Sequence, residues 1–348
     1  MNHPLMIGLT YHEDYNKYDL GLDHPLIGDK SRNTLNFFKK KKIIDDIDVI
    51  TADYASDDDL LRVHPKNYID KVKDLSKSGG YLSYDTPAPP GIYDIARLAA
   101  GGTIIAGEQL FKKYNCTVNP LAGFHHASKE HSSGFCFFND IAVVIEFLRE
   151  KYDLSKFLII DLDVHHANGT QDIYYEDPSV LLISFHQDGR TLYPGTGAID
   201  KIGSGAGEGY NINLPLPPGA GSKSYLEAFD IFIPKISLQF KPELIIYQSG
   251  VDTHHEDPLA DLKLIYQTYY YLASKVNNIS KSTCNKLLVL FGGGYNSLSC
   301  VHSYYNIVCG LLNKKEIIKE EEIQDARYSE VLKIIDELKS KISPYWSL

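Results

Sequence analysis

Hydrophobic residues occur along the chain in short runs that end at Gly, Asp, His or Asn. Several runs are almost continuously apolar, which is typical of parallel strands buried on both faces. The pattern predicts strands at residues 6–11, 48–54, 118–124, 157–164, 180–186, 210–216, 244–248 and 287–291.

Longer segments between these runs have the spacing of amphipathic helices. The apolar positions predict helices at residues 139–151, 224–240 and 262–276. Strands that alternate with helices indicate an α/β fold with a parallel sheet. In such sheets, functional side chains gather at the carboxyl ends of the strands.

The chain has no internal repeat and no low-complexity linker, and its Pro-rich stretch 86–91 is only a short loop. We therefore predict one domain over residues 1–348. The charged tail 314–348 is predicted to pack on it as a helical extension. One face of that helix is apolar: Val331, Ile334, Ile335, Leu338 and Ile342.

Composition narrows the class of protein. Hydrophobic residues make up 43% and charged residues 23% of the 348, which is ordinary for a globular protein. No apolar run reaches the 18 or more residues of a membrane span, and the N-terminus does not resemble a secretory signal. The five cysteines form no C-x-x-C pair, which favours free thiols and a cytoplasmic location.

The formal net charge is −10. Sequence-independent binding to nucleic acid needs a basic surface, so the charge argues against a direct nucleic-acid partner. An acidic surface favours a cationic partner, such as a basic peptide or a polyamine.

One predicted strand runs directly into a cluster of ionisable residues. Residues 158–169 read Leu-Ile-Ile-Asp-Leu-Asp-Val-His-His-Ala-Asn-Gly. If the chain stays extended, Asp161, Asp163 and His165 point to one face, because side chains alternate along a strand. Carboxylates and an imidazole on one face form a metal site. The alternative is a polar strand end that caps a helix.

A second strand, 244–248, is followed by Ser-Gly-Val-Asp-Thr-His-His-Glu-Asp-Pro at 249–258. Asp252 lies where it can supply a third ligand, and catalytic zinc usually keeps three protein ligands and an open position. We interpret His254 and His255 as solvent-facing loop residues rather than ligands.

Two further motifs are each compatible with a structural or a catalytic role. His125 and His126 follow a predicted strand, and such a pair is structural unless a metal lies beside it. Beside a metal, one histidine can take a proton from water and return it to a leaving amine. Tyr295 follows three glycines, either as a simple glycine turn or as a hydroxyl presented to an oxyanion.

Together, these motifs resemble those of the histone deacetylase superfamily, which includes acetylpolyamine amidohydrolases and acetoin-utilisation proteins. The resemblance runs from about Thr10 to about Asn296. Its motifs are Gly-Phe-His-His-Ala, Gly-Phe-Cys-Phe-Phe-Asn-Asp, Asp-Leu-Asp-Val-His-His-Ala-Asn-Gly-Thr, Tyr-Pro-Gly-Thr-Gly, Asp-x-x-x-x-Asp-Pro-Leu and Gly-Gly-Gly-Tyr-Asn.

The resemblance implies the arginase–deacetylase fold, a single eight-stranded parallel sheet flanked by helices. It implies zinc on Asp163, His165 and Asp252. It also implies His126 as general base and acid, His125 as its electrostatic partner, and Tyr295 as donor to the oxyanion.

The same resemblance implies supporting roles. Asp161 would orient His125, and Asn168 would lie behind His126, where many members have Asp. Because Asn carries no charge, the proton affinity of His126 is expected to be lower here. The implied potassium site uses Asp161, Asp163, His165, Ser184 and Phe185.

The substrate tunnel is implied by four residues. Gly134 and Phe135 match one wall, Tyr193 matches the other, where Phe is commoner, and Asp85 matches the carboxylate at the rim that holds the substrate backbone. The retained Tyr295 separates this chain from the poorly active subgroup that lacks it.

The resemblance therefore predicts a zinc-dependent deacetylase that releases acetate from acetyl-lysine in a protein or peptide. An acetylpolyamine amidohydrolase is the alternative, although the loop between Tyr11 and Arg32 shows no clear insertion of the polyamine type. A ureohydrolase with two manganese ions needs more carboxylates at its metal site than the motifs of this chain supply. A non-catalytic acyl-lysine binder would have lost ligands or the Tyr, and neither is lost.

Overall fold

The computed structural model of this protein describes residues 7–21, 24–26 and 28–348. The chain forms two compact units. The first contains the residues up to Leu154 and the segments 168–173 and 288–292, and the second contains the remainder. A single domain over residues 1–348 stays a prediction.

The first unit combines four strands of a large sheet with a small hairpin and helices. The sheet strands are β1 (Ile7–Tyr11), β2 (Ile47–Thr51), β5 (Cys116–Asn119) and most of β10 (Leu287–Leu290), and the hairpin strands are β3 (Tyr81–Ser83) and β4 (Thr86–Pro87). The helices are η1 (Glu13–Lys17), α1 (Lys30–Lys40), η2 (Ile43–Asp46), α2 (Asp57–Leu61), α3 (Lys66–Ser78), α4 (Ile92–Gln109), α5 (Asp140–Tyr152) and nearly all of α6 (Asn168–Tyr174).

The second unit contains the other four strands of the sheet and the C-terminal helices. The strands are β6 (Phe157–Asp161), β7 (Val180–Gln187), β8 (Asn211–Leu216) and β9 (Leu244–Gln248). The helices are η3 (Gly205–Gly207), α7 (Ser222–Phe240), α8 (Tyr266–Ser282), α9 (Ser297–Leu312) and α10 (Tyr328–Ile342).

Eight strands of the described residues form one sheet in the order β2-β1-β5-β10-β9-β6-β7-β8. The pairs β1–β2, β1–β5, β6–β7, β6–β9 and β7–β8 are parallel. Every residue of β6, β7 and β9 is buried, which explains why their sequences are almost continuously apolar up to their polar carboxyl ends. The predicted α/β class with an eight-stranded parallel sheet and flanking helices is confirmed.

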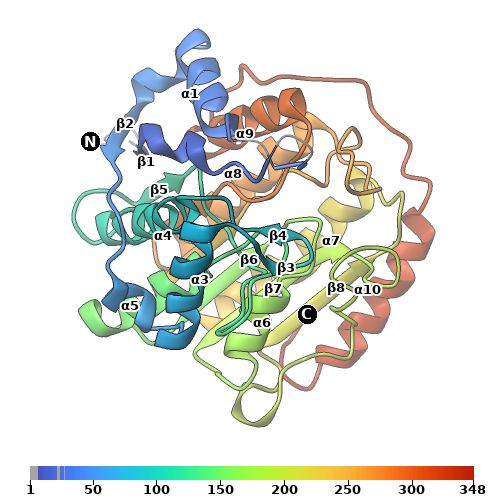
Figure 1. The fold of residues 1–348 in the computed structure, drawn as a ribbon. Helices are drawn as coiled ribbons and strands as arrows, with labels where there is room; N and C mark the ends of the chain where they lie inside the picture. Colours follow the sequence, from blue (N-terminus) through green and yellow to red (C-terminus); the bar gives the residue numbers. More distant parts are fainter. Residues whose placement is uncertain (1–6, 22–23, 27) are drawn as a thin grey trace. The chain divides into compact units, whose positions relative to one another are not determined.

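Helix starts and packing follow the sequence pattern. The Asn139 side chain accepts a hydrogen bond from the Ala142 amide and caps α5, and Asn296 caps α9 in the same way. In the second unit, α10 packs on β8 and α7 (Figure 1). Its buried face consists of Val331, Ile335, Leu338 and Ile342.

Several predicted boundaries are wrong. The strand predicted at 118–124 is β5, which ends at Asn119 because Pro120 has no amide hydrogen to continue the ladder. The strand predicted at 48–54 ends at Thr51. The helix predicted at 262–276 starts only at Tyr266, because residues 263 and 264 form isolated bridges with Gly221 and His254.

Two properties expected from composition can be compared with the structure. All five cysteines are free, and all but the half-exposed Cys284 are buried. No helix in the described part of the chain is long and apolar enough to cross a membrane.

Candidate functional site

The end of β6 turns away from extended geometry as soon as the ionisable residues begin. The Asp163 amide donates to Asp161 Oδ1 at 3.2 Å, and the His165 amide donates to Asp163 Oδ1 at 3.0 Å. Aspartate side chains that bind the amide two residues later stabilise turns. The expectation of three side chains on one extended strand face is therefore wrong, because β6 ends at Asp161.

Asp252 approaches this turn from the neighbouring strand. β9 pairs with β6 in parallel, so the carboxyl ends of both strands lie at one edge of the sheet. The Val164 amide donates to Asp252 Oδ1 at 2.9 Å, which ties the two strand ends together.

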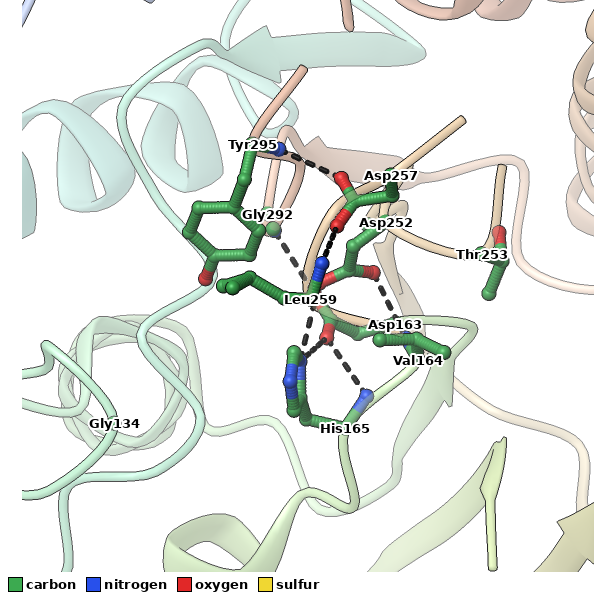
Figure 2. Close-up of polar contacts among 12 residues, drawn as sticks. Gly134, Asp163, Val164, His165, Asp252, Thr253, Asp257, Leu259, Gly292 and Tyr295 are labelled. Atoms are coloured by element: carbon green, nitrogen blue, oxygen red, sulfur yellow. Dashed lines mark hydrogen bonds and ion pairs between the residues drawn. The ribbon is translucent and has the colours of Figure 1, made fainter. Parts of the chain in front are cut away.

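The side chains of Asp163, His165 and Asp252 converge, as Figure 2 shows. His165 Nδ1 lies 3.2 Å from Asp163 Oδ1 and 3.2 Å from Asp252 Oδ2. One potential ligand atom from each residue lies within 4.8 Å of the others, and all three residues are buried. The structure thus brings together the three residues that the sequence proposes as metal ligands.

Two glycines make room for the carboxylates. A Cβ at Gly250 would lie 2.1 Å from Asp163 Oδ2, and a Cβ at Gly293 would lie 2.0 Å from Asp252 Oδ2. The Gly293 amide donates to Asp163 Oδ2 at 2.8 Å, and Gln248 Nε2 donates to the same oxygen at 2.9 Å. No larger residue fits at either glycine without moving a proposed ligand.

Electrostatics favour a cation at this place. Burial and the neighbouring Asp163 carboxylate raise the pKa of Asp252. Burial alone would lower the pKa of His165, but its hydrogen bonds with Asp163 and Asp252 outweigh that effect and raise it. Two buried carboxylates beside one imidazole hold excess negative charge, which a divalent cation balances. Two carboxylates and one imidazole are also an established donor set for zinc, so these residues fit the ion.

Tyr295 lies beside this group and is anchored by Asp257, to which the sequence motif alone assigns no role. The Tyr295 ring centroid is 6.4 Å from that of His165, in an edge-on arrangement. The Tyr295 amide donates to Asp257 Oδ2 at 2.8 Å, and Asp257 Oδ1 accepts from the Leu259 amide at 3.0 Å (Figure 2). Tyr193 also faces His165 edge-on, with centroids 6.2 Å apart.

The first unit holds the histidine pair. His126 Nδ1 lies 2.6 Å from Asn168 Oδ1, and the Nε2 atoms of His125 and His126 lie 3.1 Å apart. Because an amide oxygen only accepts, Nδ1 of His126 carries the hydrogen, and Nε2 of the neutral ring is an acceptor. Both histidines are buried.

The backbone around this pair is fixed by buried polar groups. Asp140 accepts hydrogen bonds from the amides of Gly123 and Phe124 at 3.1 and 2.8 Å. The Thr170 amide of α6 donates to the His125 carbonyl at 3.0 Å. Burial raises the pKa of Asp140 despite these bonds.

The residues of the first unit that are expected to line the tunnel are held by the β3–β4 hairpin. Asp85 Oδ2 accepts from the Gly134 amide at 3.0 Å, and Thr86 Oγ1 accepts from the Phe135 amide at 3.1 Å. Phe135 has a φ of 67°, a left-handed conformation that non-glycine residues rarely adopt. Asp85 Oδ1 additionally accepts from Ser83 and Thr86 hydroxyls. Asp85 therefore holds the backbone directly before the strained Phe135, a contact that the sequence does not reveal.

The predicted potassium residues lie in the second unit. Asp161 and Ser184 are register partners on β6 and β7, and Phe185 follows Ser184 as a fully buried residue. Potassium binding there stays a prediction, as does the orientation of His125 by Asp161.

A second group of potential ligand atoms was not anticipated. His254, His255 and Glu320 lie close enough together to hold an ion. His254 is fully buried, so the prediction of a solvent-facing residue is wrong for it, whereas His255 is partly exposed.

Residues 24–311 match the family model of the histone deacetylase domain. The chain belongs to the histone deacetylase family. A probable deacetylase of Archaeoglobus fulgidus is 31% identical over 98% of this chain and 99% of its own. A histone deacetylase-like amidohydrolase of Pseudomonas aeruginosa is 38% identical over 77% of this chain and 70% of its own.

A solved structure supports the fold of this histone deacetylase family member. The crystal structure of the HDA15 HD domain matches with a TM-score of 0.87 and 28% identity, over 98% of this chain and 96% of that one. The eight-stranded parallel sheet and this match agree with the arginase–deacetylase fold. The family consists of amidohydrolases that act on acetylated amides, and this member has a buried group of acidic and histidine side chains able to hold a metal.

Proposed function

We propose that this protein is a zinc-dependent deacetylase that releases acetate from acetyl-lysine in a peptide or protein. The observation that carries the proposal is the buried convergence of Asp163, His165 and Asp252. The glycines that leave room for the two carboxylates support it, as does membership of a family of deacetylases.

The proposed ligands would hold zinc through two carboxylates and one imidazole. When bound, zinc supplies Lewis acidity, which polarises the acetyl carbonyl and activates water at neutral pH. Tyr295 donates its hydroxyl hydrogen to the oxygen of the carbonyl as negative charge develops there. Asp257 fixes the backbone of Tyr295 for this purpose.

We propose that the histidine pair of the first unit serves the same reaction. His126 accepts a proton from the attacking water and gives it to the leaving amine. Its hydrogen bond from Nδ1 to Asn168 fixes the tautomer in which Nε2 can accept. His125, whose Nε2 is 3.1 Å from that of His126, acts as its electrostatic partner.

The substrate proposal is supported by features near the predicted rim. The chain carries a formal charge of −10, which suits a cationic peptide. The side chains of Tyr81 and Tyr84, next to Asp85 on the β3–β4 hairpin, are exposed and offer aromatic surface to a peptide. Gly134, Phe135 and Tyr193 are proposed to line the tunnel for the acetyl-lysine side chain.

The remaining parts of the proposal concern a potassium site, the extent of the domain and the cellular location of the protein. We propose potassium at Asp161, Asp163, His165, Ser184 and Phe185. We propose that residues 314–348 are a helical extension of a single deacetylase domain. The five free cysteines support a cytoplasmic location.

The test compares two substrates with zinc-loaded protein. Acetate release is measured from an acetyl-lysine peptide and, in parallel, from an acetylated polyamine. The proposal predicts a higher kcat/KM for the peptide and loss of turnover in Tyr295→Phe, which excludes a contaminating deacetylase. Faster turnover of the polyamine would refute the choice of substrate, and acetate from neither would refute the reaction.

A further inference from the structure

Glu320 lies beyond residues 24–311, the part of the chain that matches the family model, yet it contacts the loop that carries Asp252. Its Oε1 is 3.0 Å from His254 Nε2, and its Oε2 is 3.2 Å from His255 Nε2. The Tyr266 amide at the start of α8 donates to Oε1 at 2.7 Å. One carboxylate thus joins three donors from two segments.

The hydrogen positions favour this network over a second metal ion. The Glu256 amide donates to His254 Nδ1 at 3.2 Å, so the ring hydrogen lies on Nε2 and points to Glu320. A metal on Nε2 would leave the hydrogen on Nδ1, where it would face the Glu256 amide hydrogen. Burial raises the pKa of Glu320, but the hydrogen bonds from His254 and the Tyr266 amide outweigh it and leave the pKa below its usual value.

The segment that carries Glu320 is fastened by two side-chain amides. Gln267 on α8 donates to the Glu320 carbonyl at 2.8 Å and accepts from the Glu320 amide at 3.1 Å. Asn306 on α9 donates to the Ile318 carbonyl and accepts from the Ile318 amide, both at 2.8 Å. Paired bonds of this kind fix the backbone and therefore the position of the carboxylate.

The contacts of His254 continue toward the candidate site. The His254 carbonyl accepts from the Asp257 amide at 2.9 Å. The Asp257 carboxylate in turn accepts from the Tyr295 amide at 2.8 Å (Figure 2). His254 is also stacked on Tyr266, with ring centroids 4.4 Å apart, and is completely buried. A displaced His254 would move Asp257 and thereby Tyr295.

We propose that Glu320 is a positioning residue, which acts through His254 to fix loop 251–257 and, by way of Asp257, the backbone of Tyr295. The inference rests on the proposed function for the roles of Asp252 and Tyr295. It gives the segment after α9 a part in catalysis that the family match does not cover.

The test uses the full chain with Glu320→Ala, Glu320→Gln and the matched control Glu321→Ala. Glu321 is the same residue type one position along and is exposed. Hydrogen exchange of the peptide that contains Tyr295 is measured by mass spectrometry in metal-free protein. Zinc affinity, Tm, kcat and KM are measured separately.

Removing one partner of a hydrogen bond to a charged group typically changes an equilibrium or a rate by about tenfold or more. We expect Glu320→Ala to raise exchange at Tyr295 by about tenfold and to lower kcat by a similar factor, with little change in KM. Glu320→Gln should change both in the same direction but less, because its amide oxygen can still accept from His254. Glu321→Ala should behave as the unaltered protein.

Equal exchange and equal kcat in Glu320→Ala and Glu321→Ala would overturn the proposal. So would a second zinc ion per chain that Glu320→Ala removes, because the group would then be a metal site. If Glu320→Ala does not fold, unchanged exchange and kcat in Glu320→Gln would overturn it equally. If the unaltered protein releases no acetate but exchange at Tyr295 still rises in Glu320→Ala alone, the positioning role stands and the proposed function fails.

Discussion

Replacing Asn168 by Asp would place a negative charge 2.6 Å from Nδ1 of His126, where the structure has a neutral amide oxygen. His126 is only 5% exposed, so solvent screens the new charge weakly. An opposite charge this close typically shifts a pKa by about 1–3 units toward the charged form, or about 1.4–4 kcal/mol. The Asn168→Asp variant should therefore hold a proton on His126 to a higher pH.

The assay is the pH dependence of kcat/KM for acetate release. Because His126 is proposed to act as a base, activity rises as it loses its proton, and the acidic limb of the profile should move up by about 1–3 pH units in Asn168→Asp. The control is Asn168→Ala, which removes the acceptor without adding charge and should lower kcat without an upward shift of that limb. An acidic limb at the same pH in Asn168→Asp and the unaltered protein would refute the role of His126 as the base.

Three further predictions follow from other residues. Tyr295→Phe should lower kcat by ~10²–10³ with unchanged zinc content, and full activity would refute its role as oxyanion donor. Gly293→Ala should weaken zinc binding in a chelator competition, because the added Cβ would lie 2.0 Å from Asp252 Oδ2, and an unchanged affinity would contradict the proposed ligand geometry. Burial lowers the pKa of His64 from 6.5 to about 4 while its Nε2 accepts from the Asn139 amide. The fold therefore holds His64 neutral, and up to about 3 kcal/mol of stability that is present above pH 6.5 is lost as the pH falls toward 4. Urea unfolding across this pH range should show a flatter dependence in His64→Gln, and equal slopes would contradict the assignment.

Most strands were predictable because parallel strands buried on both faces need continuous apolar sequence. β9 matches its prediction at both ends, and β6 starts where expected. The end of β6 was not predictable from hydrophobicity, because Leu162 and Val164 extend the apolar pattern beyond Asp161. The strand ends there because the Asp161 and Asp163 side chains accept hydrogen bonds from the amides two residues later. A hydrophobic pattern does not show such bonds.

The convergence of the proposed metal ligands was predictable from strand ends and from the family motifs. The role of Asp257 was hidden because a motif does not show which amide a carboxylate accepts from. Asp85 was expected to face substrate, yet its carboxylate also holds the Gly134 amide, a contact between segments about 50 residues apart.

Burial of His254 was the hardest feature to foresee. A His-His pair in a polar loop favours exposure, but Tyr266 stacks on the His254 ring and the segment after α9 brings Glu320 to it. That segment is held by side-chain amides of α8 and α9 rather than by an apolar face. Its sequence therefore has no apolar periodicity that would predict its position. Long-range polar pairs of this kind leave no periodic signal in the sequence.

The central claim is that Asp163, His165 and Asp252 hold the zinc ion on which acetate release depends. The most direct measurement titrates metal-free protein with zinc while acetate release from an acetyl-lysine peptide is followed, alongside His165→Ala and Asp252→Asn. The proposal predicts that activity reaches its maximum at about one zinc ion per chain and that neither variant binds zinc or recovers activity. Full acetate release by metal-free protein, or by either variant, would contradict it.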